Sequence, residues 1–136
     1  MNTRTGHLFV VKEGRPGLLI ELDAEGNSIL QARLLNATNG FVHPTVGPDN
    51  LDFSGLSYDA ERNTIWITSD KGQCLYHYDW EQDQVLQRLD LVIEDDNKPK
   101  RIRKSEGVAI DPARSRLYVA SERDGRLYVF KIHTNG

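Results

Sequence analysis

Short apolar stretches separated by turn-forming residues run along the chain, and this pattern predicts many short β-strands. Residues 53–59 and 105–111 each carry an apolar stretch with a glycine near its start and an aspartate at its end. Turn-forming residues follow each aspartate, and further apolar stretches come after them. Runs of this length bounded by Gly, Pro, Asn and Asp are typical of strands. The expected strands fall into two matching series: 53–59, 64–70 and 73–78, then 105–111, 116–122 and 126–131.

The two series are copies of one repeat. Gly55 and Gly107 occupy the same place in it and are 52 residues apart. The pattern occurs a third time without its first strand over residues 7–22, where Leu8 precedes its counterpart Ile65 by 57 residues. Repeats of about 40 to 50 residues with four strands each are typical of β-propeller blades. We therefore predict an all-β fold, a partial β-propeller of about three four-stranded antiparallel blades.

The blades have predicted boundaries within a single domain, residues 1–136. Blade 1 covers 7–35 and lacks its inner strand, blade 2 covers 52–91, and blade 3 covers 105–133 and lacks an outer strand. Three blades are too few to close a ring, so we interpret the chain as a propeller fragment, half of a six-bladed ring, with an uncovered apolar face at each end. Such faces mark interfaces, and we expect either a homodimer or pairing with the missing half of the propeller.

Composition and charge narrow the function classes. Apolar residues make up 38% of the chain and charged residues 27%, which is typical of a folded globular protein. The net charge of −3 gives no reason to expect a nucleic-acid partner. No apolar run approaches the roughly 20 residues that cross a bilayer, so we expect no transmembrane segment. The single cysteine, Cys74, excludes a disulfide within the chain and fits a small core residue in an apolar strand.

The order of strands in a blade predicts where chemistry can gather. Each inter-blade connection enters an inner strand on the face to which the second strand returns, so the residues at these points share one face of the propeller. We name it the connection face. Oxygen-rich clusters of this kind suit a hard cation such as Ca²⁺ or position a water for hydrolysis. The expected metal ligands are Asp52, Asp70, Glu106 and Glu122, and the expected ligand-binding residues are Glu13, His43 and Ser54.

The carboxylates among these candidates have a structural alternative. Carboxylates beside glycine often accept hydrogen bonds from turn amides, and this is the alternative for Asp70, Glu106 and Glu122. The same chemistry predicts that Asp59 and Asp111 are turn formers on the opposite face.

The two long connections between blades carry the remaining candidates. His43 lies in the first, residues 36–52, and a lone loop histidine is more often inert than functional. The second carries a basic run at 98–104 next to the acidic residues 94–96. A basic patch can bind phosphate, anionic lipid or nucleic acid. Because the acidic neighbours offset the charge and no aromatic residues are interleaved, we predict a solvated loop there.

Several segments together resemble the SdiA-regulated family of bacterial propellers. The segments that carry this resemblance are 8–13, 52–59, 65–70, 105–111 and 117–122. The resemblance implies a six-bladed propeller, with the match on its C-terminal half, and a relation to esterase-like phytase propellers. It also implies a protein of the bacterial periplasm or cell envelope and, from related propellers, calcium on one face. Glu106 carries over best, whereas the matching position in the previous blade is Ser54.

Three hypotheses about function follow. The favoured one is a propeller module that binds a small ligand, metal ion or partner on the connection face. The first alternative is a calcium-dependent hydrolase of phosphate or carboxylic esters, with Glu106 among the metal ligands and its catalytic residues unknown. The second alternative is a structural half-propeller that is inactive without its other half.

Overall fold

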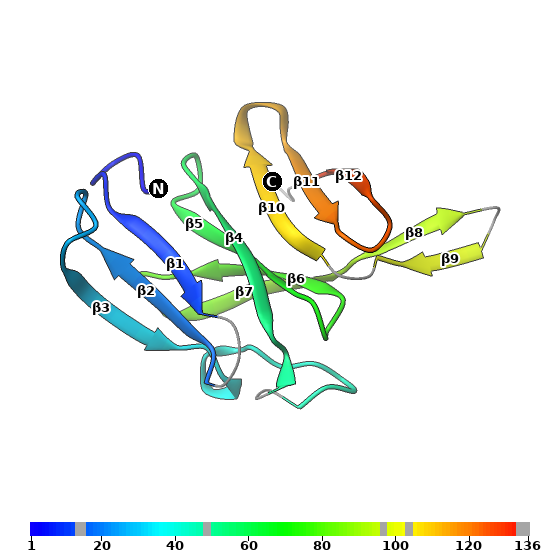
Figure 1. Ribbon diagram of the computed structural model, residues 1–136, viewed down its shortest axis with the longest axis horizontal. Helices are drawn as coiled ribbons and strands as arrows, with labels where there is room; N and C mark the ends of the chain where they lie inside the picture. Colours follow the sequence, from blue (N-terminus) through cyan, green and yellow to red (C-terminus); the bar gives the residue numbers. More distant parts are fainter. Residues whose placement is uncertain (13–15, 48–49, 96–97, 103–104, 133–136) are drawn as a thin grey trace.

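The strands of the chain form antiparallel sheets that lie side by side in a row (Figure 1). The computed structural model describes residues 1–12, 16–47, 50–95, 98–102 and 105–132. Within these ranges the three larger sheets have three, four and three strands, and the helical elements include the short 3-10 helices η1 (Ala37–Asn39) and η3 (Pro112–Arg114). No helix in the same ranges is long and apolar enough to cross a membrane. The predicted all-β fold of partial propeller blades is confirmed.

Each of the three larger sheets is one blade. Blade 1 consists of β1 (Leu8–Lys12), β2 (Leu18–Leu22) and β3 (Ile29–Leu34). Blade 2 consists of β4 (Phe53–Asp59), β5 (Thr64–Ser69), β6 (Cys74–Asp79) and β7 (Gln84–Asp90). Blade 3 consists of β10 (Ser105–Asp111), β11 (Arg116–Ser121) and β12 (Arg126–Lys131). Among the described residues, blade 1 has no counterpart of β4 and blade 3 has none of β7.

Blades 2 and 3 repeat the same backbone irregularity at the start of the inner strand. β4 begins opposite the end of β5, and β10 begins opposite the end of β11. In both pairs the register shifts by one residue directly after the first pair, which is the signature of a β-bulge. The extra residue is Ser54 in blade 2 and Glu106 in blade 3.

Two apolar cores fill the junctions between blades. The first lies between blades 1 and 2 and contains Phe9 and Tyr76. The second lies between blades 2 and 3 and contains Trp66 and Leu117. Blade 2 is therefore covered on both faces, and every residue of β5 is buried. Cys74 is fully buried in the first core, which confirms its predicted place.

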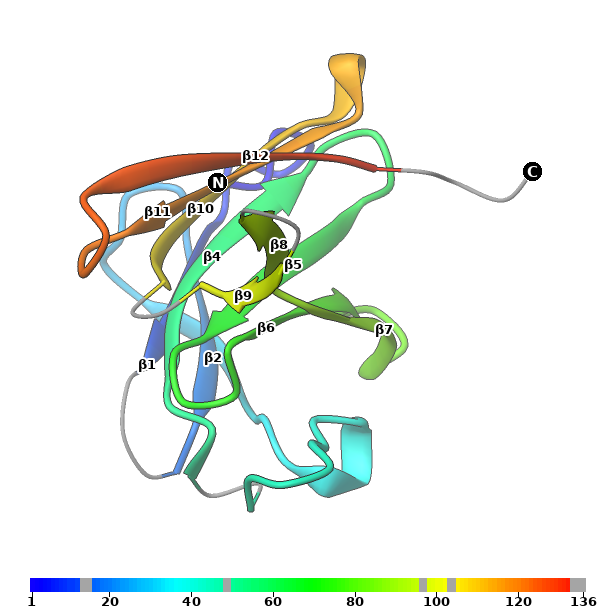
Figure 2. The ribbon, with the colours of Figure 1, turned by 90° about the vertical axis from the view of Figure 1, so that its right-hand side faces the viewer.

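The outward faces of blades 1 and 3 carry exposed apolar side chains. Val10 in β1 is 45% exposed, and Leu127 and Val129 in β12 are 62% and 56% exposed. Figure 2 looks along the row from the blade 3 end, so that blade 3 lies on the side toward the viewer. A further blade stacked on either end would remove these side chains from water.

The second long connection contains a β-hairpin, so the prediction of a loop is wrong for residues 98–101, although Lys98, Pro99 and Arg101 are exposed to solvent as predicted. β8 (Val92–Asp95) pairs antiparallel with β9 (Lys98–Arg101), and the hairpin projects away from the row beside blade 3 (Figure 1). Asp95 lies opposite Lys98 in the register. Opposite charges across a strand pair stabilise the pairing, so the neighbouring acidic and basic runs favour a hairpin over a loop.

Candidate functional site

The connection face carries the starts of β4 and β10, the turns that follow β5 and β11, and the two long connections. Ser54 and Asp70 lie at this end of blade 2, and Glu122 lies at the same end of blade 3. Glu13 lies outside the described residues. Only the backbone of Glu106 is described, as the bulge residue of β10.

The hydroxyl group of Ser54 joins the inner strands of two blades. Its Oγ donates to the Ser105 carbonyl oxygen at 2.5 Å and lies 3.1 Å from the Thr68 Oγ1. The bulge turns the side chain out of the normal alternation of the strand, which allows this reach toward blade 3. Ser54 therefore holds β4 against β10, and its predicted role in ligand binding stays a prediction.

His43 fastens the first long connection to blade 2. Its Nε2 lies 3.0 Å from the Gly72 carbonyl oxygen, and its Nδ1 accepts the N–H groups of Thr45 and Val46 at 3.1 and 3.2 Å. Because Nδ1 accepts, Nε2 carries the proton and donates to Gly72. Both ring nitrogens are thus engaged within the chain, which supports the structural alternative for His43.

Two of the predicted metal ligands are joined by a hydrogen bond between their backbones. The Asp70 N–H donates to the Asp52 carbonyl oxygen at 3.1 Å, and Asp52 has a φ of 55°, which Asp tolerates better than most residues. Glu122 is exposed in the turn after β11. In the part of the chain that the structure describes, no three His, Cys, Asp or Glu side chains form a group that could hold a metal ion. The Glu106 side chain lies outside that part, so the calcium site stays a prediction.

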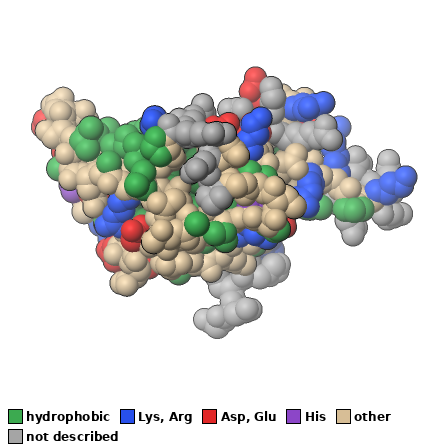
Figure 3. All heavy atoms as spheres, turned by 90° about the horizontal axis from the view of Figure 1, so that it is seen from below, with side chains coloured by type: hydrophobic (Ala, Val, Ile, Leu, Met, Phe, Trp, Pro, Cys, Tyr) green, Lys and Arg blue, Asp and Glu red, His purple; other side chains and the backbone are tan. Residues whose placement is uncertain are grey.

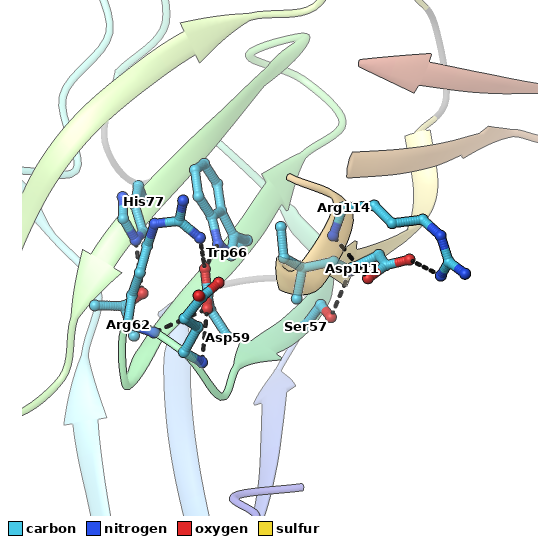
Figure 4. A network of polar contacts seen from close by, with 10 residues as sticks. Ser57, Asp59, Arg62, Trp66, His77, Asp111 and Arg114 are labelled. Carbon is cyan, nitrogen blue, oxygen red and sulfur yellow. Dashed lines mark hydrogen bonds and ion pairs between the residues drawn. The ribbon is translucent and has the colours of Figure 1, made fainter. Parts of the chain in front are cut away.

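Asp59, on the opposite face, is the centre of a buried polar network (Figure 4). One carboxylate oxygen accepts the N–H groups of Glu61 and Arg62 at 3.1 and 3.0 Å. The other accepts the Arg62 guanidinium at 2.9 Å and the Trp66 indole N–H at 3.1 Å. Burial alone would raise the pKa of Asp59, but these hydrogen bonds hold the pKa below its usual value. The predicted turn-forming role is confirmed.

Asp111 repeats the same turn in blade 3 (Figure 4). It accepts the Arg114 N–H at 3.3 Å and the Arg114 guanidinium at 2.8 Å. The hydrogen bond from the guanidinium holds the pKa of Asp111 below its usual value. The neighbouring Ile110 N–H donates to the Ser57 hydroxyl of blade 2 at 3.1 Å, which ties the two blades together at this point.

Sequence reasoning missed His77, which stacks on Trp66 inside the second core. The two ring centroids are 3.9 Å apart and the ring planes differ by 2°, while the His77 Nε2 lies 2.6 Å from the Thr64 Oγ1. Burial lowers the pKa of His77 to about 4, so the ring is neutral at pH 7. The signal was present in the sequence, because strand pairing across the turn after β5 places residue 77 opposite residue 66.

A polar pocket of about 590 Å³ lies on the connection face between blades 2 and 3. It is lined by residues of three segments: Gln73 from the turn after β5, Pro99, Lys100 and Arg101 from β9, and Arg123 and Asp124 from the turn after β11. Figure 3 views the molecule from this side and shows Lys and Arg side chains gathered toward the end that carries the hairpin. Of the predicted candidates whose side chains the structure describes, none lines this pocket.

The pocket has an excess of positive charge. Its one carboxylate, Asp124, accepts the Tyr128 hydroxyl at 2.9 Å, and this hydrogen bond, with the nearby Lys100, holds the pKa of Asp124 below its usual value. Among the described residues, none of the three cations Lys100, Arg101 and Arg123 is in an ion pair.

Comparisons with known proteins show which family the sequence matches and which solved structures have a similar fold. The family described as SdiA-regulated matches residues 1–131. Among solved structures the chain is similar to a luciferin-regenerating enzyme, with a TM-score of 0.53, 18% identity, and coverage of 88% of this chain and 35% of that one. It is also similar to U3-55K, with a TM-score of 0.54, 9% identity, and coverage of 96% of this chain and 37% of that one. The chain thus spans little more than a third of these proteins, and at such identities the likeness concerns the fold alone. No curated protein sequence matches the chain.

Proposed function

The chain belongs to the SdiA-regulated family, and we propose that it is a propeller module that binds a small anionic ligand in the polar pocket on its connection face. The observation that carries this proposal is the convergence of Lys100, Arg101 and Arg123 on one pocket of about 590 Å³. Small-molecule sites commonly have volumes of about 300 to 1,000 Å³, and cationic side chains in them select carboxylates and phosphates. The hypothesis favoured from the sequence, a propeller module that binds a small ligand, is thereby narrowed to anionic ligands.

The register of the hairpin places two of these cations opposite apolar positions of β8. Lys100 and Arg101 lie opposite Ile93 and Val92, whereas the acidic Asp95 lies opposite Lys98 near the tip. Guanidinium groups bind phosphate and carboxylate oxygens with two hydrogen bonds at once, which suits Arg101 and Arg123 to this role.

Titration calorimetry of the intact chain with sodium pyrophosphate tests the proposal. A hydrogen bond to a charged group contributes about 1.5–3 kcal/mol, and the lower value suits partly exposed side chains. Lys100→Gln and Arg123→Gln should therefore each weaken pyrophosphate binding by about tenfold. Binding should also weaken as sodium chloride is added, because salt screens exposed charges.

Two control variants separate this pocket from the general charge of the molecule. Lys98→Gln removes a charge from the same strand as Lys100, and Arg116→Gln removes one from β11, but neither residue lines the pocket. Both should bind pyrophosphate almost as the unmodified chain does. Equal losses in all four variants would indicate attraction by net charge alone, and no heat at millimolar pyrophosphate would contradict the proposal outright.

A further inference from the structure

The polar pocket on the connection face has an inner group of side chains and a rim. The inner group, Gln73, Lys100 and Asp124, is half-buried, whereas Arg101 and Arg123 at the rim are exposed. Lys100 and Asp124 carry opposite charges, so the inner group has no net charge. The two guanidinium groups give the rim an excess of positive charge. The pocket is therefore suited to a ligand with one anionic end and one polar, uncharged end.

The size and the lining of the pocket restrict the class of this ligand. A water molecule takes up about 30 Å³ in the liquid, so a volume of about 590 Å³ corresponds to roughly 20 non-hydrogen atoms. Pyrophosphate would occupy less than half of this space, whereas a hexose monophosphate would fill most of it. Among the described lining residues, Pro99 is the only apolar one and none is aromatic. A nucleobase would find no ring to stack on, so the lining favours a hydrophilic ligand.

The junction between blades 1 and 2 shows how the same end of a junction is closed by packing. Gly17 directly precedes β2, and a Cβ atom on it would lie 2.8 Å from the ring of Phe53, so the two residues are in close contact. In the junction between blades 2 and 3, the counterpart of Gly17 is Gln73, which directly precedes β6, and the counterpart of Phe53 is Ser105, which begins β10. Two polar side chains thus replace a glycine and a large apolar ring.

Ser105 brings a buried hydroxyl group into the junction between blades 2 and 3. The residue is fully buried, and in the part of the chain that the structure describes its Oγ has no hydrogen-bond partner. Buried polar groups without partners are rare, because they lower stability. Since Phe53 lies against Gly17, the repeat places Ser105 on the side of β10 toward Gln73. This junction therefore keeps polar groups beside the pocket at a position where the other junction is packed with an apolar ring.

We propose that the ligand of this pocket is a phosphate monoester of a sugar. Its phosphate group contacts Arg101 and Arg123 at the rim. Its hydroxyl groups bond to the inner group, in which Asp124 accepts hydrogen bonds from them and would repel a second phosphate group. A phosphate monoester carries a charge of about −1.5 to −2 at pH 7, which matches two guanidinium groups. This inference rests on the proposed anion site and names the chemistry of the rest of the ligand.

Titration calorimetry of the intact chain with two phosphate monoesters tests the inference. Glucose 6-phosphate and ethyl phosphate carry the same charged group, but only glucose 6-phosphate has hydroxyl groups. Glucose 6-phosphate should bind at least about tenfold more tightly, the effect of one hydrogen bond to a charged group. Equal affinities for the two esters, with pyrophosphate also bound, would overturn the inference and leave the anion site in place. An absence of binding by all three compounds would contradict both.

The variant Asp124→Asn tests the inner group without a change of side-chain volume. It should weaken glucose 6-phosphate binding by about fivefold, because a neutral acceptor replaces a charged one. It should strengthen pyrophosphate binding by about threefold, because a like charge is removed. Damage to the fold would weaken the binding of both compounds, so opposite changes identify a direct contact with the hydroxyl groups. Changes of the same sign, or no change for glucose 6-phosphate, would overturn the inference.

A double variant copies the closed junction. Ser105→Phe combined with Gln73→Gly should remove the preference for glucose 6-phosphate over ethyl phosphate, because a ring then stands where the inner group binds. Gln82→Gly, in an exposed turn of blade 2 outside the pocket, is the matched control and should keep the preference. Circular dichroism checks the fold, and Asp124→Asn decides the question if the double variant does not fold. A preference that survives in the folded double variant would overturn the inference.

Discussion

Replacement of Asp59 by asparagine keeps the side-chain volume and removes one acceptor from a fully buried position. In the native chain, one carboxylate oxygen accepts two turn amides and the other accepts the Arg62 guanidinium and the Trp66 indole. An amide has a single oxygen, so whichever way the new side chain rotates, one of these two sets of donors faces an NH₂ group. The substitution therefore leaves buried donors without acceptors.

The structure allows an estimate of the cost. A buried donor without an acceptor costs about 1–3 kcal/mol, and a hydrogen bond to a charged group contributes about 1.5–3 kcal/mol. Trp66 is 1% exposed, so water cannot replace the lost acceptor. We expect Asp59→Asn to lower the free energy of unfolding by about 3 kcal/mol, a large share of the total for a single domain.

Urea unfolding followed by tryptophan fluorescence measures this change, because Trp66 is a member of the network. The matched control is Asp111→Asn, which alters the same Asp-x-x-Arg turn in blade 3. Asp111 is more exposed, and its side chain accepts from Arg114 and the turn backbone rather than from a buried indole, so its loss should cost far less. The reasoning is refuted if Asp59→Asn lies within about 0.5 kcal/mol of the unmodified chain, which is the range of ordinary surface substitutions, or if the two variants lose equal stability.

The pH dependence of the same variant has a defined sign. The folded-state pKa of Asp59 lies below its unfolded value, which is about 3.9. The contribution of the carboxylate is therefore fully present above the unfolded pKa and is lost as the pH falls through the folded pKa. The stability difference between the unmodified chain and Asp59→Asn should stay constant from pH 7 to about 5 and shrink at lower pH.

Three further predictions concern the core, the ends and the metal. The pKa of His77 is about 4 in the folded chain, so as the pH falls this histidine takes up a proton in the unfolded chain first. The free energy of unfolding should therefore fall by up to about 1.4 kcal/mol per pH unit from pH 6.5 toward 4. Urea unfolding measures this dependence, and His77→Phe should flatten it. We propose that two copies of the chain pair through the exposed apolar faces of their end blades. Light scattering should then give the mass of a dimer for the unmodified chain and of a monomer for Val10→Lys. A monomeric unmodified chain at every concentration contradicts this proposal. If the calcium site predicted from the sequence exists, CaCl₂ should raise the midpoint temperature of thermal unfolding, and Glu106→Gln should remove that rise. Equal midpoint temperatures with and without calcium contradict the predicted site.

The blades could be predicted because their repeat is carried by apolar and turn residues. Gly55 and Gly107 mark the bulged starts of inner strands, and Asp59 and Asp111 mark the turns at the other end. These residue types report directly on backbone geometry, so the strand order follows from their spacing. Buried strands such as β5 have continuous apolar character because the structure covers them on both faces.

The hairpin and the pocket could not be predicted in the same way. Residues 98–101 are charged and include a proline, so they lack the composition of a strand, although they pair with residues 92–95. The pocket brings together Gln73, Lys100 and Arg123, which are distant in sequence and individually resemble solvated surface residues. Only the fold places these three segments side by side.

The two junctions between blades differ in how completely their outer ends are packed. Arg33 and Trp80 close the junction between blades 1 and 2, and their counterparts Leu89 and Ile132 leave an apolar pocket between blades 2 and 3. If the repeat served stability alone, the second junction would gain from the same closing residues, because a filled cavity retains contacts that an open one loses. The Leu89→Arg and Ile132→Trp substitutions copy the closed junction, so together they should raise the free energy of unfolding, which urea unfolding measures.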